Sequence, residues 1–166
     1  MSPIRIRIRD EGSILDDLGY CFLTLGWFGE AVKSFSEYLK IRPSDIDGRF
    51  FLASAYASLK WTDEAIQELK KILVSDPTDV LARHDLGLCY RDKGWLKESL
   101  EEMRMANTYA TTHGTAEEKE VIKGSLGNLE KEIEDEDDDR SKIISLLVLL
   151  SVVKKMSRLK RKRPKH

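Results

Sequence analysis

Residues 46–79 read IDGRFFLASAYASLKWTDEAIQELKKILVSDPTD, and their pattern recurs 34 positions earlier and 34 positions later. When the three segments are aligned, equivalent positions form columns that hold leucines, tryptophans, glutamates or aromatic residues. These columns are Leu18, Leu52 and Leu86; Trp27, Trp61 and Trp95; Glu30, Glu64 and Glu98; and Phe22, Tyr56 and Tyr90. Self-similarity at one fixed period of this length is the signature of a repeat architecture. The sequence therefore predicts three tandem units, at 12–45, 46–79 and 80–113.

Each unit is predicted to be two helices joined by a short turn. In residues 46–79, apolar positions at helical spacing lie on both sides of the turn at 60–63. Pro77 ends the second helix because proline cannot continue one, and Thr78 or Asp79 can cap the next helix. Small residues occupy two columns where antiparallel helices would cross closely, namely Gly19, Ala53 and Gly87, and Ala31, Ala65 and Ser99.

This pattern resembles the tetratricopeptide repeat (TPR) family, whose 34-residue helix–turn–helix units share a Leu-Gly, Tyr, Ala, Phe and Pro signature. The matching residues are Leu18, Gly19, Phe22, Ala31, Phe35 and Pro43 in unit one, Leu52, Ala53, Tyr56, Ala65, Leu69 and Pro77 in unit two, and Leu86, Gly87, Tyr90, Ser99, Met103 and Ala106 in unit three, where Thr111 replaces the proline. The resemblance implies an all-α helix–turn–helix solenoid. It also implies a non-catalytic adaptor or scaffold in protein–protein interaction.

Further segments flank the three units. Residues 1–11 form an N-terminal arm in which isoleucines and arginines alternate, as in a strand that could join a partner's sheet or in a loosely docked end. Thr115 and Glu118 form a capping box for a helix over 114–134, whose apolar stripe would cover the last unit. We expect 135–140 to be an acidic spacer and 141–166 to be a separate apolar and basic helix with its tail.

Composition excludes several function classes. No apolar run reaches the roughly 20 residues of a transmembrane helix, and residues 1–10 contain no signal-peptide core. With only Cys21 and Cys89, a disulfide-stapled secreted scaffold is excluded, so we expect a reducing, cytoplasmic location and two small, buried thiols. The three histidines stand far apart and no phosphate-binding loop is present, so the sequence predicts no catalytic residue, metal or cofactor.

In the TPR family, the first helices of the units commonly form the inner face of a groove for an extended peptide. By resemblance, the groove residues here are Asp16, Asp17, Tyr20, Asp47, Phe50, Phe51, Ser54, His84, Asp85, Leu88 and Asp92. Chaperone-binding members hold a terminal carboxylate with Lys, Asn and Arg, whereas the corresponding residues here are Asp16, Tyr20, Phe51, Leu81 and Asp85. Because carboxylates would repel such a ligand, chaperone C-terminal tails are disfavoured.

An acidic and aromatic groove favours a basic or apolar peptide segment instead. The alternative is that the carboxylates form a solvated helix face and the aromatic rings fill gaps between units. The three tryptophans carry a similar choice. They could form a ladder for a partner along one edge, but we favour each indole folding over its own unit.

Charge divides the C-terminal part from the rest of the chain. The net charge is −1, yet residues 140–166 hold ten Lys or Arg and no acidic residue, which leaves 18 basic and 29 acidic side chains, a balance of −11, elsewhere. The helix here is expected to lie on a surface, since 143–153 would rise only about 16 Å. Its contact residues are expected to be Ile143, Ile144, Leu146, Leu147, Leu150, Lys154, Lys155 and Arg158.

Several partners fit this C-terminal helix. An anionic membrane surface, the capping helix, a second copy of the chain and the acidic groove all remain open. A function of another class also remains, that of a regulatory or nucleic-acid-associated factor. In that case Lys160–Pro164 would contact phosphates, or would serve as a nuclear address in a eukaryote.

Overall fold

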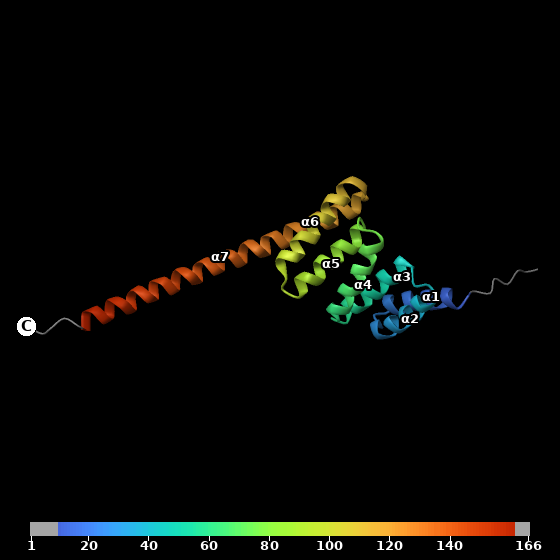
Figure 1. Ribbon diagram of the computed structural model, residues 1–166, viewed down its shortest axis with the longest axis horizontal. Coiled ribbons are helices and arrows are strands. Elements are labelled where there is room, and N and C mark those ends of the chain that lie inside the picture. Colours follow the sequence, from blue (N-terminus) through green and yellow to red (C-terminus); the bar gives the residue numbers. More distant parts are fainter. Residues whose placement is uncertain (1–9, 162–166) are drawn as a thin grey trace, which may run out of the picture. The chain divides into compact units, whose positions relative to one another are not determined.

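Seven helices make up most of the described part of the chain (Figure 1). The computed structural model describes residues 10–161, with side chains placed for residues 10–151. The helices are α1 (Glu11–Thr24), α2 (Phe28–Ile41), α3 (Ile46–Ser58), α4 (Thr62–Ser75), α5 (Val80–Asp92), α6 (Leu96–His113) and α7 (Ala116–Arg161). The described residues contain no strand. The all-α fold predicted from the 34-residue period is confirmed.

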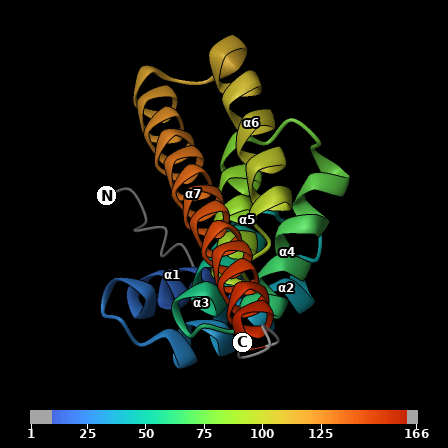
Figure 2. The ribbon, with the colours of Figure 1, turned by 90° about the vertical axis from the view of Figure 1, so that its left-hand side faces the viewer.

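The first six helices form three successive pairs. α1 packs against α2, α3 against α4, and α5 against α6, while α2–α3 and α4–α5 contacts join one pair to the next (Figures 1 and 2). Each pair falls within one of the three predicted units, except that α1 begins one residue earlier, at Glu11. The first helix of each pair starts at an aspartate whose carboxylate accepts a hydrogen bond from the backbone N–H three residues on: Asp10 from Ser13, Asp45 from Gly48, and Asp79 from Ala82, each at 2.8 Å.

Small residues allow the two helices of each pair to approach closely. Gly19 and Gly87 are buried, and a Cβ added to either would lie 2.8 Å from a side chain of the facing helix, that of Phe35 or Met103. In the third pair the Ser99 hydroxyl also donates a 2.7 Å hydrogen bond to the Gly87 carbonyl. The close helix crossing predicted from the small columns is therefore present.

Each paired-helix turn contains one residue in the left-handed backbone region. These residues are Gly26 with φ 75°, Lys60 with φ 61° and Gly94 with φ 73°, spaced by the repeat period. Glycine adopts this conformation without steric cost, but a lysine does not. The second turn is therefore strained where the first and third are not.

An arginine ties each of the last two pairs to the loop before it. Arg49 donates to Glu68 at 2.7 Å and to the Pro43 carbonyl, and Arg83 donates to Glu102 at 2.7 Å and to the Pro77 carbonyl. Both ion pairs are mostly buried, with side-chain exposures of 12–18%. These bonds connect the inter-repeat loop with both helices of the following pair.

α7 begins with the predicted capping box. The Thr115 N–H donates to the Glu118 carboxylate at 2.8 Å, and the Glu118 N–H donates to the Thr115 hydroxyl at 3.2 Å. One turn further on, Ile122 is fully buried against Ala106 and Ala110 of α6. The start of α7 therefore covers the apolar face of the last pair.

The predicted acidic spacer at 135–140 is instead helical, and no separate C-terminal helix begins after it. α7 runs continuously to Arg161 because residues 128–161 contain neither glycine nor proline to end it. Lys142 also bonds to Asp138 at 2.6 Å, one helical turn earlier. The chain divides after Leu126 into two compact units, Met1–Leu126 and Gly127–His166. Among the described residues, no helical stretch combines the length and the hydropathy needed to cross a membrane.

Candidate functional site

A hollow of about 290 Å³ lies between α3 and α5. Four of the predicted groove residues line it together, namely Ser54, Asp85, Leu88 and Asp92. The rest of its lining consists of Ala53, Ala57, Ser58, Lys60, Leu69, Cys89 and Arg91. Two consecutive first helices therefore bring residues 30 or more positions apart in the chain to one concave surface.

The hollow has an apolar floor and a charged rim of mixed sign. Leu69 and Cys89 are 2% and 6% exposed, while Lys60 bonds to Asp92 at 3.0 Å. Burial raises the pKa of the Cys89 thiol to about 11, and the nearby charges of Asp85 and Asp92 add to this effect. Sequence reasoning missed Lys60 and Arg91, so the hollow is less acidic than predicted. The sequence did offer one signal for Lys60, because it stands 34 residues from both Gly26 and Gly94 and therefore occupies the same turn position of its repeat.

A second group of predicted residues meets between α1 and α3. Tyr20 lies edge-on to Phe51 with ring centroids 5.7 Å apart, and Phe51 also stacks on the buried Phe35 at 5.5 Å. Phe50 contacts Phe51 edge-on at 6.4 Å. Tyr20 remains 54% exposed. The aromatic residues therefore fill the space between the first two units, and Tyr20 still offers a large exposed surface.

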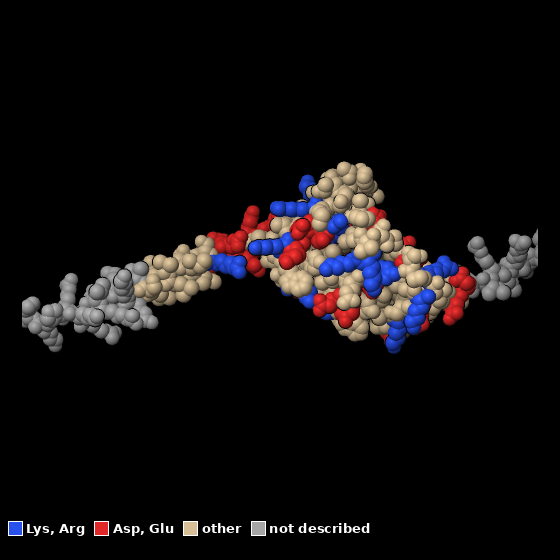
Figure 3. Space-filling view, viewed as in Figure 1, with Lys and Arg blue, Asp and Glu red and all other residues tan. Residues whose placement is uncertain are grey.

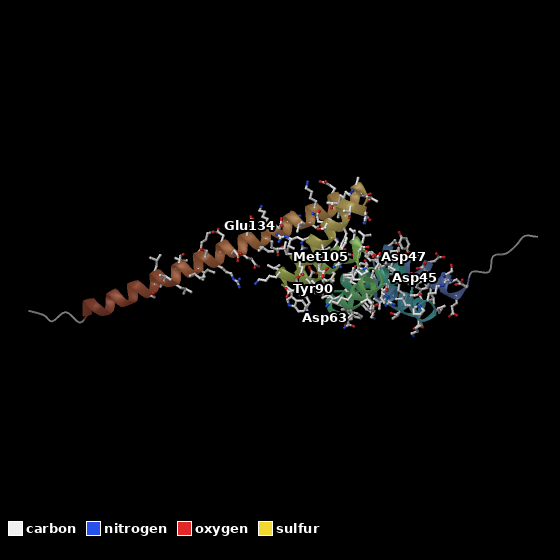
Figure 4. All side chains as sticks on the ribbon, turned by 45° about the horizontal axis from the view of Figure 1, so that its top comes forward. Asp45, Asp47, Asp63, Tyr90, Met105 and Glu134 are labelled. Atoms are coloured by element: carbon white, nitrogen blue, oxygen red, sulfur yellow. The ribbon has the colours of Figure 1, made fainter. Side chains whose placement is uncertain are left out.

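Carboxylates gather beside these rings, around the start of α3. The pKa of Asp16 is raised, first by burial and then by the negative charges of Asp45 and Asp47. Asp45 and Asp47 stand close together at the start of α3 (Figure 4). Asp45, which sequence reasoning did not select, accepts a 2.8 Å hydrogen bond from the Tyr38 hydroxyl. Asp17 is exposed at the next position of α1, about 100° round the helix from Asp16.

His84 is a correction to the predicted groove, because it is only 8% exposed. Its Nδ1 lies 3.0 Å from an Asp85 oxygen, and its Nε2 lies 2.9 Å from the hydroxyl of Ser125 in α7. A carboxylate, an imidazole and a hydroxyl are thus hydrogen-bonded in sequence. Of these three residues only Asp85 lines the hollow, so a ligand there would not reach His84 or Ser125. The imidazole is therefore a buried tie between α5 and α7, which covers this position of the inner face.

The tryptophans pack as favoured, each on its own repeat. Trp27, Trp61 and Trp95 lie against Phe22, Tyr56 and Tyr90, with ring centroids 5.7–5.9 Å apart. Their other faces leave them 45–56% exposed. The prediction for the thiols was right for Cys89 and wrong for Cys21, which is exposed because no described helix precedes α1 to cover it.

The apolar residues predicted for contact on the C-terminal helix are exposed, and they are Ile143, Ile144, Leu146, Leu147 and Leu150. The side chains of Lys154, Lys155 and Arg158 lie outside the described residues, as do positions 1–9 of the N-terminal arm and residues 162–164 of the basic cluster. Within residues 10–151, no group of His, Cys, Asp and Glu is arranged to hold a metal ion.

Comparison with known proteins places this architecture. The tetratricopeptide repeat family model matches residues 13–45 and 46–79. No curated protein sequence matches the chain.

Solved structures with the same fold include TPR domains and secretion chaperones. The Sgt2 TPR domain from Aspergillus fumigatus is 20% identical with a TM-score of 0.69, over 82% of this chain and 88% of that one. The TPR2B domain of yeast Sti1 in complex with pHsp70 is 22% identical with a TM-score of 0.68, over 73% of this chain and 97% of that one. The Yersinia enterocolitica type III secretion chaperone SycD, in complex with a peptide of the translocator YopD, is 18% identical with a TM-score of 0.66, over 76% and 98%.

The two matched segments coincide with α1–α2 and α3–α4, and α5–α6 repeats the same pair a third time. The columns quoted from the sequence occupy the same places in each pair, with the small residues at the helix crossings and the tryptophans at the turns. On this evidence residues 13–79 are two tetratricopeptide repeats, and α5–α6 repeats their helix pair in the same fold.

Proposed function

We propose that the chain is a non-catalytic adaptor that holds a peptide segment of a partner protein against α1, α3 and α5. The observation that carries this proposal is the hollow between α3 and α5, where Ser54, Asp85, Leu88 and Asp92 converge from two repeats. A concave site with an apolar floor and a few convergent polar groups is the usual form of a binding site.

The chemistry of the surface favours a segment with both basic and apolar side chains. The floor at Leu69 and Cys89 accepts an apolar side chain, since burying one there removes apolar surface from water on both sides. Between α1 and α3, burial and then the negative charges of Asp45 and Asp47 raise the pKa of Asp16, and a Lys or Arg of the ligand would relieve that repulsion. The exposed ring of Tyr20 adds an aromatic face beside that position.

Peptide complexes among the structural neighbours support this class of function. One neighbour is bound to an HSP90 peptide, one to pHsp70 and one to a translocator peptide. For this chain we disfavour a chaperone C-terminal tail, because Asp16 and Asp85 stand where a terminal carboxylate would need cationic partners.

Selection of short peptides from a display library, followed by fluorescence anisotropy with the full chain, tests the proposal. We expect the selected peptides to combine Lys or Arg with Leu, Ile or Phe. The double variant Phe50→Ala with Asp85→Lys should weaken their binding at least tenfold, which is about 1.4 kcal/mol. Glu64→Lys, at an exposed position of α4, is the matched charge control and should leave binding unchanged.

Two results would contradict the proposal. Selected peptides that end in an acidic, carboxylate-rich tail would show that the groove has the opposite preference. Binding that the double variant leaves unchanged would show that the peptide lies elsewhere on the molecule.

A further inference from the structure

Residues 143–150 of α7 are apolar around nearly the whole helix circumference. Every residue of this stretch is apolar except Ser145, and the seven large side chains are 57–64% exposed: Ile143, Ile144, Leu146, Leu147, Val148, Leu149 and Leu150. In Figure 3 this stretch forms an uncharged segment that follows a cluster of acidic side chains. A helix that is hydrophobic all round is normally buried, so this segment indicates an interaction surface.

Blocks of opposite charge lie on the two sides of this apolar stretch at matched distances, with Arg140 and Lys142 between the stretch and the acidic block. Glu134–Asp139 is an unbroken acidic run of six exposed residues on its N-terminal side. Five basic residues of α7 follow on the other side: Lys154, Lys155, Arg158, Lys160 and Arg161. Leu147 stands midway between the centres of the two charged blocks, and also within one residue of the middle of the apolar stretch.

This symmetry makes the segment complementary to itself in one orientation. A second copy laid antiparallel and centred on Leu147 would bring Asp139 into register with Lys155, Glu136 with Arg158, and Glu134 with Lys160. These three pairs of opposite charge outnumber the one like-charged pair of that register, Arg140 with Lys154. The apolar stretches would then face each other in the middle. A parallel copy would instead place acidic run against acidic run and basic block against basic block, and like charges in register are destabilising.

We propose that residues 134–161 of α7 are a self-association surface, which pairs with the same segment of a second copy in antiparallel orientation. The paired segment is 28 residues and therefore about 42 Å long. An anionic membrane surface fits less well, because the six carboxylates that end three residues before the apolar stretch would be repelled by it and outnumber the intervening Arg140 and Lys142. Since the apolar residues surround the helix, a pair leaves one apolar face on which a second pair can dock.

Sedimentation velocity of the full chain tests whether the segment associates. We expect the mass of two or four copies in the wild type and of one copy in Leu147→Asp, which places a charge at the centre of the apolar stretch. Val74→Asp is the matched control, because Val74 is 83% exposed on α4, and it should associate as the wild type does. A monomeric wild type, or a Leu147→Asp variant that still associates, would overturn the proposal.

Charge exchange tests the orientation. Changing Glu134, Glu136 and Asp139 to Lys, or changing Lys155, Arg158 and Lys160 to Glu, should each weaken self-association at least tenfold. A chain with both sets exchanged should associate with itself again but should not pair with the wild type. Pairing of the exchanged chain with the wild type would indicate parallel helices and overturn the proposal, as would half-exchanged variants that associate normally.

Binding of the apolar stretch to a membrane surface is tested with the same proteins. Vesicles of an anionic phospholipid should not capture the wild-type chain at concentrations where it is associated. Capture of the chain that depends on residues 140–166 and dissolves the oligomer would assign the apolar stretch to lipid and overturn self-association. The circular dichroism and thermal transition of each variant show whether the repeat unit remains folded.

Discussion

The first repeat and the two that follow it use the same residue columns but bury them differently. Leu18, Leu52 and Leu86 share one column, yet Leu18 is 42% exposed while Leu52 and Leu86 are 5% and 2% exposed. α3 and α5 each pack on the second helix of the preceding pair, whereas no described helix precedes α1. The pattern within a repeat therefore specifies the helix pair, and the neighbouring repeat supplies the burial.

Truncating this leucine column should give the largest effect. Leu52→Ala and Leu86→Ala each remove a buried side chain and leave a cavity, so each should lower the free energy of unfolding by about 2–5 kcal/mol. Leu18→Ala should cost less than about 1 kcal/mol because much of that side chain is already in water. Urea denaturation followed by circular dichroism measures all three. Equal losses of unfolding free energy at the three positions would contradict the conclusion that the neighbouring repeat supplies the burial.

At the other end of the array the start of α7 covers the last helix pair, and this cover can be tested one side chain at a time. Ile122→Ala should lower the free energy of unfolding by about 2–4 kcal/mol, since the side chain is fully buried on α6. Val121→Ala is the matched control and should stay within about 0.5 kcal/mol, because Val121 is 55% exposed. If thermal unfolding moves by the same amount in both variants, the start of α7 does not stabilise the repeats.

The turns within the repeats also differ, and here the second repeat is the less favourable one because its turn contains the strained backbone of Lys60. Lys60→Gly should raise the free energy of unfolding by about 1 kcal/mol, since it relieves a left-handed lysine and loses only an exposed ion pair with Asp92. Gly94→Lys should lower it by a similar amount. Chemical denaturation of the two variants gives both signs. A destabilised Lys60→Gly variant would mean that the ion pair outweighs the backbone strain.

The two thiols share a column and differ in environment, which predicts a small dependence of stability on pH. Cys89 has its pKa raised to about 11 in the folded chain, above the model-peptide value of 9.0. Its contribution to stability is therefore fully present below about pH 9 and is lost as pH rises through 11. Between pH 8 and 9.5 the loss should be under about 1 kcal/mol, and Cys89→Ala should remove it.

A labelling experiment contrasts the two thiols directly. A maleimide should modify the exposed Cys21 at pH 7 many times faster than Cys89. Labelling of both at the same rate would show that the α3–α5 hollow opens as readily as the surface of α1.

Sequence periodicity predicted the helix pairs, and the resemblance to the tetratricopeptide repeat family predicted part of the candidate site. The columns of Gly19 and Ala31 identified the helix crossings, because close packing tolerates only small residues there. The family resemblance placed Asp85, Leu88 and Asp92 in the groove, and all three line the hollow.

What periodicity could not predict depends on contacts between distant segments. His84 has groove spacing, but Ser125 lies against it, 41 positions away. Lys60 lines the hollow from a left-handed turn position, and only the glycines at the same position of the other two repeats, Gly26 and Gly94, indicate that conformation. The acidic run of α7 looked like a spacer by charge, although its residues are tolerated in helices and no helix-breaking residue follows them.

The arginine bonds at the inter-repeat loops have a consequence for residues 46–79, which form a repeat that could be duplicated as a whole. The segment contains both Arg49 and Glu68, and the polar bonds at its start use a proline carbonyl and a capping aspartate before it. It also ends with those same two groups, in Pro77 and Asp79, which Arg83 and α5 already use. A duplicate inserted after Asp79 would thus meet at both of its junctions the bonding partners that it has now. Unequal recombination or protein engineering could therefore lengthen the array by one whole repeat at a time while keeping the same hydrogen bonds at each junction.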